Sequence, residues 1–239
     1  MSLLKYLPEN LKEWLRRRAG AITAVQRLEN LRRAGFRPQK IIDAGAFEGE
    51  WTRMVRRVFS TAEVLMIEPQ REREPALQAA VRVFPGVRLR RSLLGSRPGR
   101  ARFLLEATNS RMLTGDWEPP AGSRIEELPV ETLADVMQAE GFADVDFLKL
   151  DLQGHELDAL EGAGPLFGTC EVIWVEVSWL RIGNPPLAHE VIARFVEHGY
   201  RLYDVLGHNY RPLDSALWQT DFVFVHADSM LLADLRWSK

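Results

Sequence analysis

The sequence has little cysteine, no long apolar runs and no excess of charge of either sign. Cys170 is the only cysteine among 239 residues, so no disulfide forms within the chain, and a reducing cytoplasm is expected. No run of about 18 apolar residues occurs, and charged residues interrupt the N-terminal stretch, which argues against a membrane span and a signal peptide. A net charge of −2 gives no indication of a nucleic-acid partner.

The stretch IIDAGAFEGEWT, residues 41–52, also lacks the two common phosphate-binding motifs. Its two glycines, Gly45 and Gly49, do not fit G-x-G-x-x-G, and no Gly-Lys-Ser/Thr is present. Asp43 precedes them, and a pyrophosphate beside this carboxylate would bring like charges together at low dielectric. Glycines at this spacing still let a ligand approach the backbone, so the turn favours a ligand that presents something other than phosphate.

Short apolar runs alternate with helical patterns after residue 34, which is typical of one α/β domain over residues 35–239. Strands are expected at 40–45, 62–69, 86–95, 100–107, 145–154, 170–179, 200–207 and 220–227, and helices at 48–60, 71–84, 131–142, 155–167 and 187–199. Solidly apolar strands predict a mostly parallel sheet with helices on both faces. Only residues 208–219 separate the last two strands, too few for a crossover helix, so these two strands should be antiparallel.

Residues 1–34 are expected to form an N-terminal helical extension. Apolar residues from Leu4 to Leu31 recur at helical spacing, and arginines cluster around them. We expect an amphipathic helix that packs on the main domain with its basic face in water. The alternative is a helix that lies on a membrane surface or covers a site.

Four of the predicted strands carry carboxylates toward their carboxyl ends, and ligands of such sheets bind at the carboxyl ends of the strands. The four carboxylates are Asp43, Glu68, Asp151 and Glu176. Glu68 lies 25 residues after Asp43, near the spacing at which an acid on the second strand reaches the hydroxyls of a ribose. A ligand with a ribose and a cationic sulfonium suits this acidic edge, so the residues indicate S-adenosylmethionine.

A family resemblance supports this interpretation. DFLKLDLQGHELDALEGA, residues 146–163, resembles the signature of the FkbM family of S-adenosylmethionine-dependent methyltransferases, and IIDAGAFEGEWT, VLMIEP and VETLADV are similar to other segments of that family. Two positions depart from the family pattern: AFEG replaces the usual Ala-Asn-x-Gly, and Ala134 replaces a common aspartate. The resemblance implies a Rossmann-like seven-stranded methyltransferase sheet with a reversed last strand pair. It also implies methyl transfer, usually to a hydroxyl of a sugar, glycan or secondary metabolite.

The resemblance also assigns expected roles to matched positions. Asp43, Gly45 and Gly49, with Ala46 in the same turn, are expected at the amino-acid end of the cofactor, and Glu68 at the ribose. Ser92 and Leu93 are expected beside the adenine. Asp151 is expected beside the methionine portion or the acceptor.

A hydroxyl acceptor needs a base, and the candidates are Asp151, His155 and Glu176. For His155 a solvent-facing place in the first helical turn is an equal alternative. Mg²⁺ held by Asp151, Glu176 and a histidine is possible but not favoured. The loops 107–123 and 180–190 are expected to shape the acceptor site, together with some of the aromatic residues Trp174, Trp179, Tyr203, Tyr210 and Trp218.

Two other functions stay open at this point. A nicotinamide-dependent oxidoreductase is disfavoured by the broken dinucleotide motif. A non-catalytic interaction module is disfavoured by the acidic edge, which such a module does not need.

Overall fold

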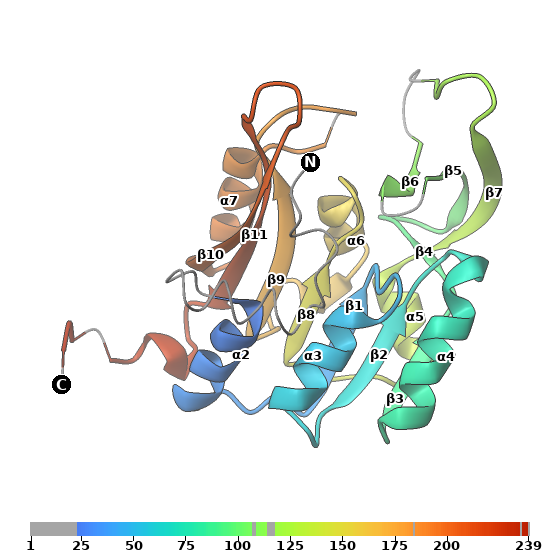
Figure 1. The fold of residues 1–239 in the computed structure, drawn as a ribbon. Helices are drawn as coiled ribbons and strands as arrows, with labels where there is room; N and C mark the ends of the chain where they lie inside the picture. Colours follow the sequence, from blue (N-terminus) through green and yellow to red (C-terminus); the bar gives the residue numbers. More distant parts are fainter. Residues whose placement is uncertain (1–22, 107–108, 114–117, 184, 235, 239) are drawn as a thin grey trace, which may run out of the picture.

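A seven-stranded sheet is the centre of the molecule (Figure 1). The computed structural model describes residues 23–106, 109–113, 118–183, 185–234 and 236–238. The strands of this sheet run in the order β10-β11-β9-β8-β1-β2-β3. Their bounds are β1 Lys40–Ala44, β2 Glu63–Ile67, β3 Val87–Arg90, β8 Phe147–Leu150, β9 Val172–Ser178, β10 Tyr200–Tyr210 and β11 Leu217–His226.

The pairing of these strands confirms the predicted topology. β1, β2, β3, β8 and β9 pair in parallel, whereas β11 is antiparallel to both of its neighbours, β9 and β10. In β1 the adjacent side chains Ile41 and Ile42 are both fully buried, one in the core on each face of the sheet. A strand covered on both faces has no solvent side, so it reads as a continuous apolar run.

Helices cover both faces, as predicted (Figure 1). One face packs against α2 Ala24–Arg33, α3 Glu50–Val58 and α4 Glu74–Val83, and the other against α5 Leu133–Glu140, α6 Glu156–Glu161 and α7 Ala188–Glu197. Single 3-10 turns lie at Arg71–Arg73, Gly164–Leu166 and Met230–Leu232.

The N-terminal extension is described only from residue 23 onward. Thr23 caps α2 by accepting from the Gln26 N–H, and Leu28 and Leu31 are buried in the same core as α3. Arg27 forms an ion pair of 2.7 Å with Asp204 of β10. The helix expected over residues 1–22 lies outside the described residues, and the division at residue 34 stays a prediction.

A second, four-stranded sheet was not predicted. It has the order β4-β7-β5-β6, from β4 Leu93–Leu94, β5 Gly99–Leu105, β6 Arg111–Met112 and β7 Arg124–Glu131. The strand expected at 86–95 therefore divides between the two sheets as β3 and β4. β7 escaped prediction because half of the residues of RIEELPVE are charged and because it contains Pro129, a residue that disfavours a strand interior.

Two further observations concern the cellular setting. In the part of the chain that the structure describes, no helix is long and apolar enough to cross a membrane. Cys170 is a buried free thiol. The cytoplasmic location stays a prediction.

Candidate functional site

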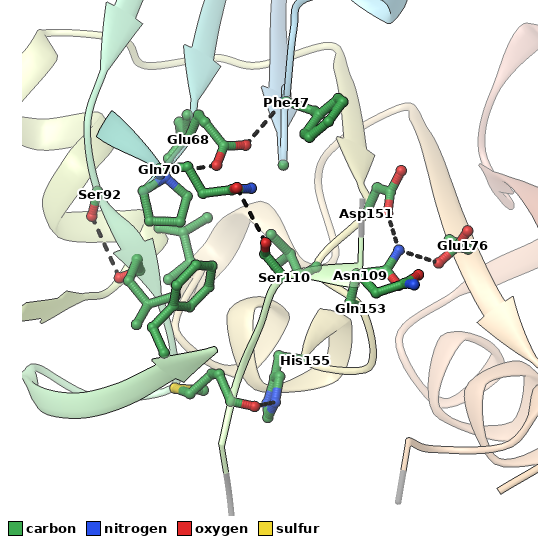
Figure 2. Close-up of a pocket in the computed structure, with 18 of the residues that line it drawn as sticks. Phe47, Glu68, Gln70, Ser92, Asn109, Ser110, Asp151, Gln153, His155 and Glu176 are labelled. Atoms are coloured by element: carbon green, nitrogen blue, oxygen red, sulfur yellow. Dashed lines mark hydrogen bonds between the residues drawn. The ribbon is translucent and has the colours of Figure 1, made fainter. Parts of the chain in front are cut away.

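A pocket of about 330 Å³ opens where β1, β2, β8 and β9 end, and the small sheet forms its roof (Figure 2). The main sheet and its loops contribute Gly45, Phe47, Ile67, Glu68, Pro69, Gln70, Ser92, Asp151, Leu152, Gln153, His155, Glu176, Asn209, Trp218 and Gln219. The roof contributes Leu93, Leu94, Phe103, Asn109, Ser110 and Met112. Polar contacts hold the roof, and two of them lie at the pocket: Ser110 Oγ donates to Gln70 Oε1 at 3.1 Å, and His155 Nε2 donates to the Met112 carbonyl at 3.0 Å.

The turn after β1 places backbone atoms of a glycine, with no side chain to cover them, at the pocket. Gly45 has φ +77°, and its N–H donates to the Ile67 carbonyl at 2.9 Å. A Cβ at residue 45 would lie 1.8 Å from the Asp151 carbonyl oxygen, so only glycine fits where the β1 turn touches the loop after β8. Phe47 also has a positive φ, +49°, and its ring lies under the Arg73 guanidinium at 4.0 Å.

Glu68 is a buried carboxylate that backbone donors hold in place. Its Oε2 accepts from the Phe47 N–H at 2.8 Å and its Oε1 from the Gln70 N–H at 3.0 Å. Burial raises the pKa of Glu68, and the two N–H donors oppose that shift. Each carboxylate oxygen keeps a second lone pair, so Glu68 can accept from two adjacent hydroxyls.

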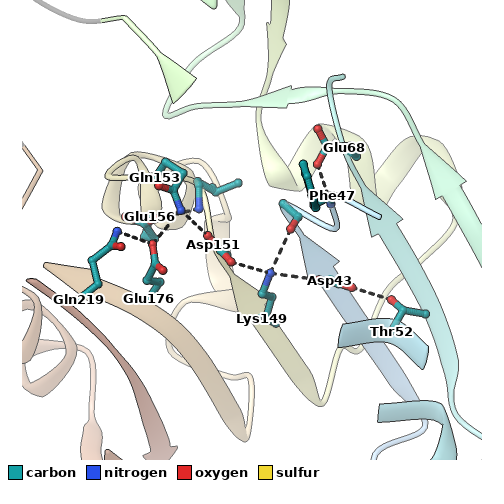
Figure 3. Close-up of polar contacts among 12 residues, drawn as sticks. Asp43, Phe47, Thr52, Glu68, Lys149, Asp151, Gln153, Glu156, Glu176 and Gln219 are labelled. Atoms are coloured by element: carbon teal, nitrogen blue, oxygen red, sulfur yellow. Dashed lines mark hydrogen bonds and ion pairs between the residues drawn. The ribbon is translucent and has the colours of Figure 1, made fainter. Parts of the chain in front are cut away.

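Lys149 is the buried cation of the site, and the prediction from sequence gave it no role (Figure 3). Its Nζ donates to the Gly45 carbonyl at 3.0 Å and lies 3.3 Å from Asp151 Oδ2 and 3.5 Å from Asp43 Oδ1. Burial alone would lower the pKa of Lys149, but the surrounding aspartates together raise it, so the side chain stays charged. A single lysine inside the apolar strand FLKL was the available signal.

Gln153 joins the two carboxylates of the β8–β9 side. Its Nε2 donates to Asp151 Oδ1 and to Glu176 Oε2, both at 2.9 Å, and Gln219 Nε2 donates to the same Glu176 oxygen at 2.8 Å. Gln153 has φ +54°, a conformation that non-glycine residues rarely adopt. The surrounding contacts therefore hold it in a strained backbone position beside the pocket.

Two carboxyl groups on this side, those of Glu176 and Asp221, have raised pKa values. Burial, with Asp151, Glu156 and Asp221 nearby, raises the pKa of Glu176 to about 10. Burial and then Asp151 raise the pKa of Asp221, its cross-strand neighbour on β11, to about 7. One lysine cannot neutralise so many acids, so some of these groups keep their protons at neutral pH.

His155 and Glu156 begin α6 and fix the loop after β8. Glu156 Oε1 accepts from the Leu152 N–H at 2.8 Å and the Gly154 N–H at 3.1 Å. His155 Nδ1 contacts Asp158 Oδ2 at 2.9 Å, in addition to the contact of Nε2 with the Met112 carbonyl. Both partners are acceptors, so both ring nitrogens donate, which requires the cationic imidazolium. Burial lowers the pKa of His155, but Asp158, Glu156 and the Met112 carbonyl together raise it.

The structure brings most of the predicted site residues to one pocket. Gly45, Glu68, Ser92, Leu93, Asp151, His155 and Glu176 line it. Asp43, Ala46 and Gly49 do not. Asp43 is fully buried beneath the turn, where it accepts from Thr52 Oγ1 at 2.6 Å and pairs with Lys149. Ala46 is buried in the core, and Gly49 begins α3 with φ +77°. Because β1 ends beneath the floor of the pocket, these three residues support the turn and do not face the pocket.

The arrangement offers little to a metal ion. Among the described residues, no group of three histidine, cysteine, aspartate or glutamate side chains is placed to hold one. Asp151 and Glu176, with a histidine, were the candidate ligands for Mg²⁺. The Gln153 amide nitrogen donates to both carboxylates, so a hydrogen-bond donor occupies the place of a cation.

A smaller pocket of about 200 Å³ adjoins the first and shares Asn109, Gln153, Trp218 and Gln219 with it. Its other lining residues are Arg111, Ser178, Ile182 and Pro185. Asn109 and Arg111 come from the predicted loop 107–123, and Ile182 and Pro185 from the loop 180–190. Of the five aromatic candidates, Trp218 lines both pockets, whereas Trp174 is buried in the core.

These features define a methyltransferase-type α/β fold with an acidic pocket at the carboxyl ends of its strands. The model of the family described as "Methyltransferase FkbM domain" matches residues 43–202. The chain therefore belongs to the FkbM methyltransferase family, as its motifs predicted. The family and the fold support methyl transfer that depends on S-adenosylmethionine.

Two solved structures are similar to this chain. Methyltransferase FkbM from Methylobacillus flagellatus KT is 18% identical with a TM-score of 0.50, and the match covers 77% of this chain and 43% of that one. The chain thus spans less than half of the length of that relative. A precorrin-6y C5,15-methyltransferase from Geobacter metallireducens GS-15 is 10% identical with a TM-score of 0.47, covering 84% and 87%. No curated protein is significantly similar in sequence.

Proposed function

We propose that this protein transfers a methyl group from S-adenosylmethionine to a hydroxyl of a sugar, glycan or secondary metabolite. The observation that supports this proposal is the difference between the two sides of one pocket. Glu68 is held by backbone donors on one side, and Asp151 and Glu176 lie together on the other. A diol and a positive charge in one ligand match these two sides.

The residues that line the pocket also favour S-adenosylmethionine over a dinucleotide. Among the described residues that line the larger pocket there is no arginine and no lysine, although a pyrophosphate needs such partners or several backbone donors. The carboxylates Glu68 and Asp151 would repel it. This composition supports the sulfonium cofactor over a nicotinamide dinucleotide.

In this proposal each part of the pocket has one task. Glu68 binds the ribose, Ser92 and Leu93 lie beside the adenine, and Gly45 and Asp151 border the methionine portion. When bound, S-adenosylmethionine supplies an electrophilic methyl group on a positively charged sulfur. Either Asp151 or Glu176 would take the hydroxyl proton, since a base must act as the acceptor oxygen attacks. His155 would hold the roof rather than act as a base, because both of its ring nitrogens already donate.

The adjoining pocket would receive the acceptor. The Trp218 ring offers an apolar face, and the amides of Asn109, Gln153 and Gln219 offer both donors and acceptors of hydrogen bonds. This combination suits a ring that carries hydroxyl groups. The two loops that line this pocket would select among acceptors.

Calorimetric titration tests the donor part of the proposal. We expect binding of S-adenosylmethionine and of the product S-adenosylhomocysteine, and no binding of NADH or NADPH. Tight binding of a nicotinamide nucleotide and none of S-adenosylmethionine would overturn it. Hydroxylated acceptors are then screened with isotope-labelled methyl donor and mass spectrometry. Transfer to nitrogen or carbon, with none to oxygen, would overturn the choice of a hydroxyl.

A further inference from the structure

Glu176 is surrounded by ionisable groups on every packed element. The end of β8 brings Lys149 and Asp151, α6 brings Glu156, and β11 brings Asp221 directly opposite in the antiparallel register. The other polar neighbours are neutral amides: Gln153 and Gln219 donate to it, and Asn209 of β10 lines the same pocket. His155 and Glu68 are the remaining titratable groups of this lining. The contacts to Asp158 and Met112 occupy both nitrogens of His155, and the N–H groups of Phe47 and Gln70 hold Glu68 on the β1–β2 side.

Both amide hydrogen bonds to Glu176 end on one oxygen. Gln153 Nε2 and Gln219 Nε2 donate to Oε2, at 2.9 and 2.8 Å, and no hydrogen bond to Oε1 comes from another described residue. The two donors suit an ionised and a neutral carboxyl equally, because either form accepts through Oε2. Glu176 can therefore gain or lose a proton on Oε1 without a rearrangement of its neighbours.

We propose that Glu176 exchanges its proton for the positive charge of the methyl donor. This inference rests on the proposed function. Glu176 is neutral in the free protein, because burial among carboxylates disfavours another negative charge. A cation in the pocket offsets that repulsion, so Glu176 ionises when the sulfonium is bound. The product S-adenosylhomocysteine carries a neutral thioether, which does not offset the repulsion among the carboxylates. Glu176 therefore stays protonated when the product is bound.

The exchange makes Glu176 a base only when the donor is present. As the acceptor oxygen bonds to the methyl carbon, the carbon–sulfur bond breaks and its electron pair stays on sulfur. Glu176 takes the hydroxyl proton in the same turnover. The positive charge of the donor and the negative charge of Glu176 thus disappear together, and no isolated charge is left in the buried site.

The neighbouring carboxyl groups are less suited to this exchange. Asp151 already pairs with Lys149, and Glu156 accepts two backbone N–H groups and does not line the pocket. Asp221 does not line it either, but its pKa of about 7 makes it the competing proton carrier. Asp221→Asn is therefore the matched control for Glu176→Gln.

Proton release on binding tests the proposal. The full chain is titrated with S-adenosylmethionine and with S-adenosylhomocysteine, in buffers of different ionisation enthalpy. We expect wild type to release about one more proton with S-adenosylmethionine than with S-adenosylhomocysteine, and its affinity for the sulfonium to rise up to about tenfold per pH unit above neutrality. Glu176→Gln should abolish both effects, whereas Asp221→Asn should keep them. The groups of the ligand titrate alike in all variants, so the difference belongs to residue 176.

Isotope-edited infrared spectroscopy gives a second readout. With the donor bound, the band of a protonated carboxyl should disappear in wild type, and this change should be missing in a folded Glu176→Gln protein. Equal proton release with both ligands, or a difference that Glu176→Gln keeps and Asp221→Asn removes, would overturn the inference alone. Failure to bind S-adenosylmethionine at all would overturn the proposed function, and this inference with it.

Discussion

The two sides of the pocket hold their carboxylates in different ways. On the β1–β2 side, which comprises Gly45, Phe47, Glu68 and Gln70, backbone N–H groups fix a single acid. The β8–β9 side comprises Lys149, Asp151, Gln153, Glu176 and Gln219. Here side-chain amides and one lysine hold several acidic side chains that lie close together.

The β1–β2 side is therefore suited to rigid recognition of a ligand, whereas the β8–β9 side is suited to a change of charge when a ligand binds. Backbone donors cannot swing away, so the β1–β2 side offers one fixed geometry to a neutral diol. The β8–β9 side has more acids than cations, so its charge depends on pH and on what enters the pocket. Four variants break or sharpen this contrast.

Lys149→Met should have the largest effect. It leaves Asp43 and Asp151 without their cation, and removal of one partner from a buried ion pair costs roughly 3–5 kcal/mol of unfolding free energy. Urea denaturation measures the loss. Lys40→Met, on the half-buried first residue of β1, is the control and should stay within about 0.5 kcal/mol of wild type. Equal costs for the two variants would mean that Lys149 does not hold the acids.

Gly45→Ala should have the second largest effect, because the added Cβ would push the turn after β1 away from the loop after β8. Its Cβ meets the Asp151 carbonyl at 1.8 Å in addition to the strain of φ +77°. Gly86 has φ +81° but no atom nearer than 3.6 Å, so Gly86→Ala carries the strain alone. We expect Gly45→Ala to unfold more easily than Gly86→Ala by about 2 kcal/mol, from the overpacking. Similar denaturation midpoints would show that the close approach is unimportant.

Glu68→Ala tests the rigid side. If Glu68 holds the ribose, calorimetry should show S-adenosylmethionine binding weakened by roughly 1–3 kcal/mol, with S-adenosylhomocysteine weakened equally. Glu63→Ala, at the exposed start of β2, is the matched control and should leave affinity unchanged. Unchanged affinity of Glu68→Ala would remove this residue from the binding site. A loss confined to the sulfonium would make its role electrostatic.

His155→Gln should have the smallest effect, about 1 kcal/mol, and it should depend on pH. The pKa of His155 is raised in the folded protein, so its stabilisation is full below the unfolded pKa of about 6.5 and is lost as pH rises through the folded value. Hydrogen exchange of the roof strands β5 and β6 at low and high pH measures the cost. A cost that grows with pH would contradict the cationic contact with Met112.

The sequence predicted the main sheet well because its central strands β1, β2, β8 and β9 are buried on two faces and read as apolar runs. It failed for β7, where half of the residues are charged and Pro129 lies inside the strand. Glu68, Asp151 and Glu176 were predicted to meet because they follow strands that end at one edge. Asp43 was predicted there too, but its depth below the turn depends on where β1 stops, which periodicity does not resolve.

Lys149 and Gln153 show a different limit. Both act through what lies beside them in space: Lys149 touches the end of β1, and Gln153 bridges to β9. A lone lysine in an apolar strand signals a buried partner but does not name it. Positive φ at Gln153 and Phe47 has no sequence signal, because neither residue type favours that conformation.

The position of β11 decides when the pocket can exist at all. This last strand lies between β9 and β10, and its first residues supply Trp218 and Gln219 to the rim. A ribosome must therefore release the chain through β11 before these side chains can take their places. Until then an emerging polypeptide has the earlier strands of the sheet but an incomplete rim, so ligand capture would report that β11 has emerged and paired.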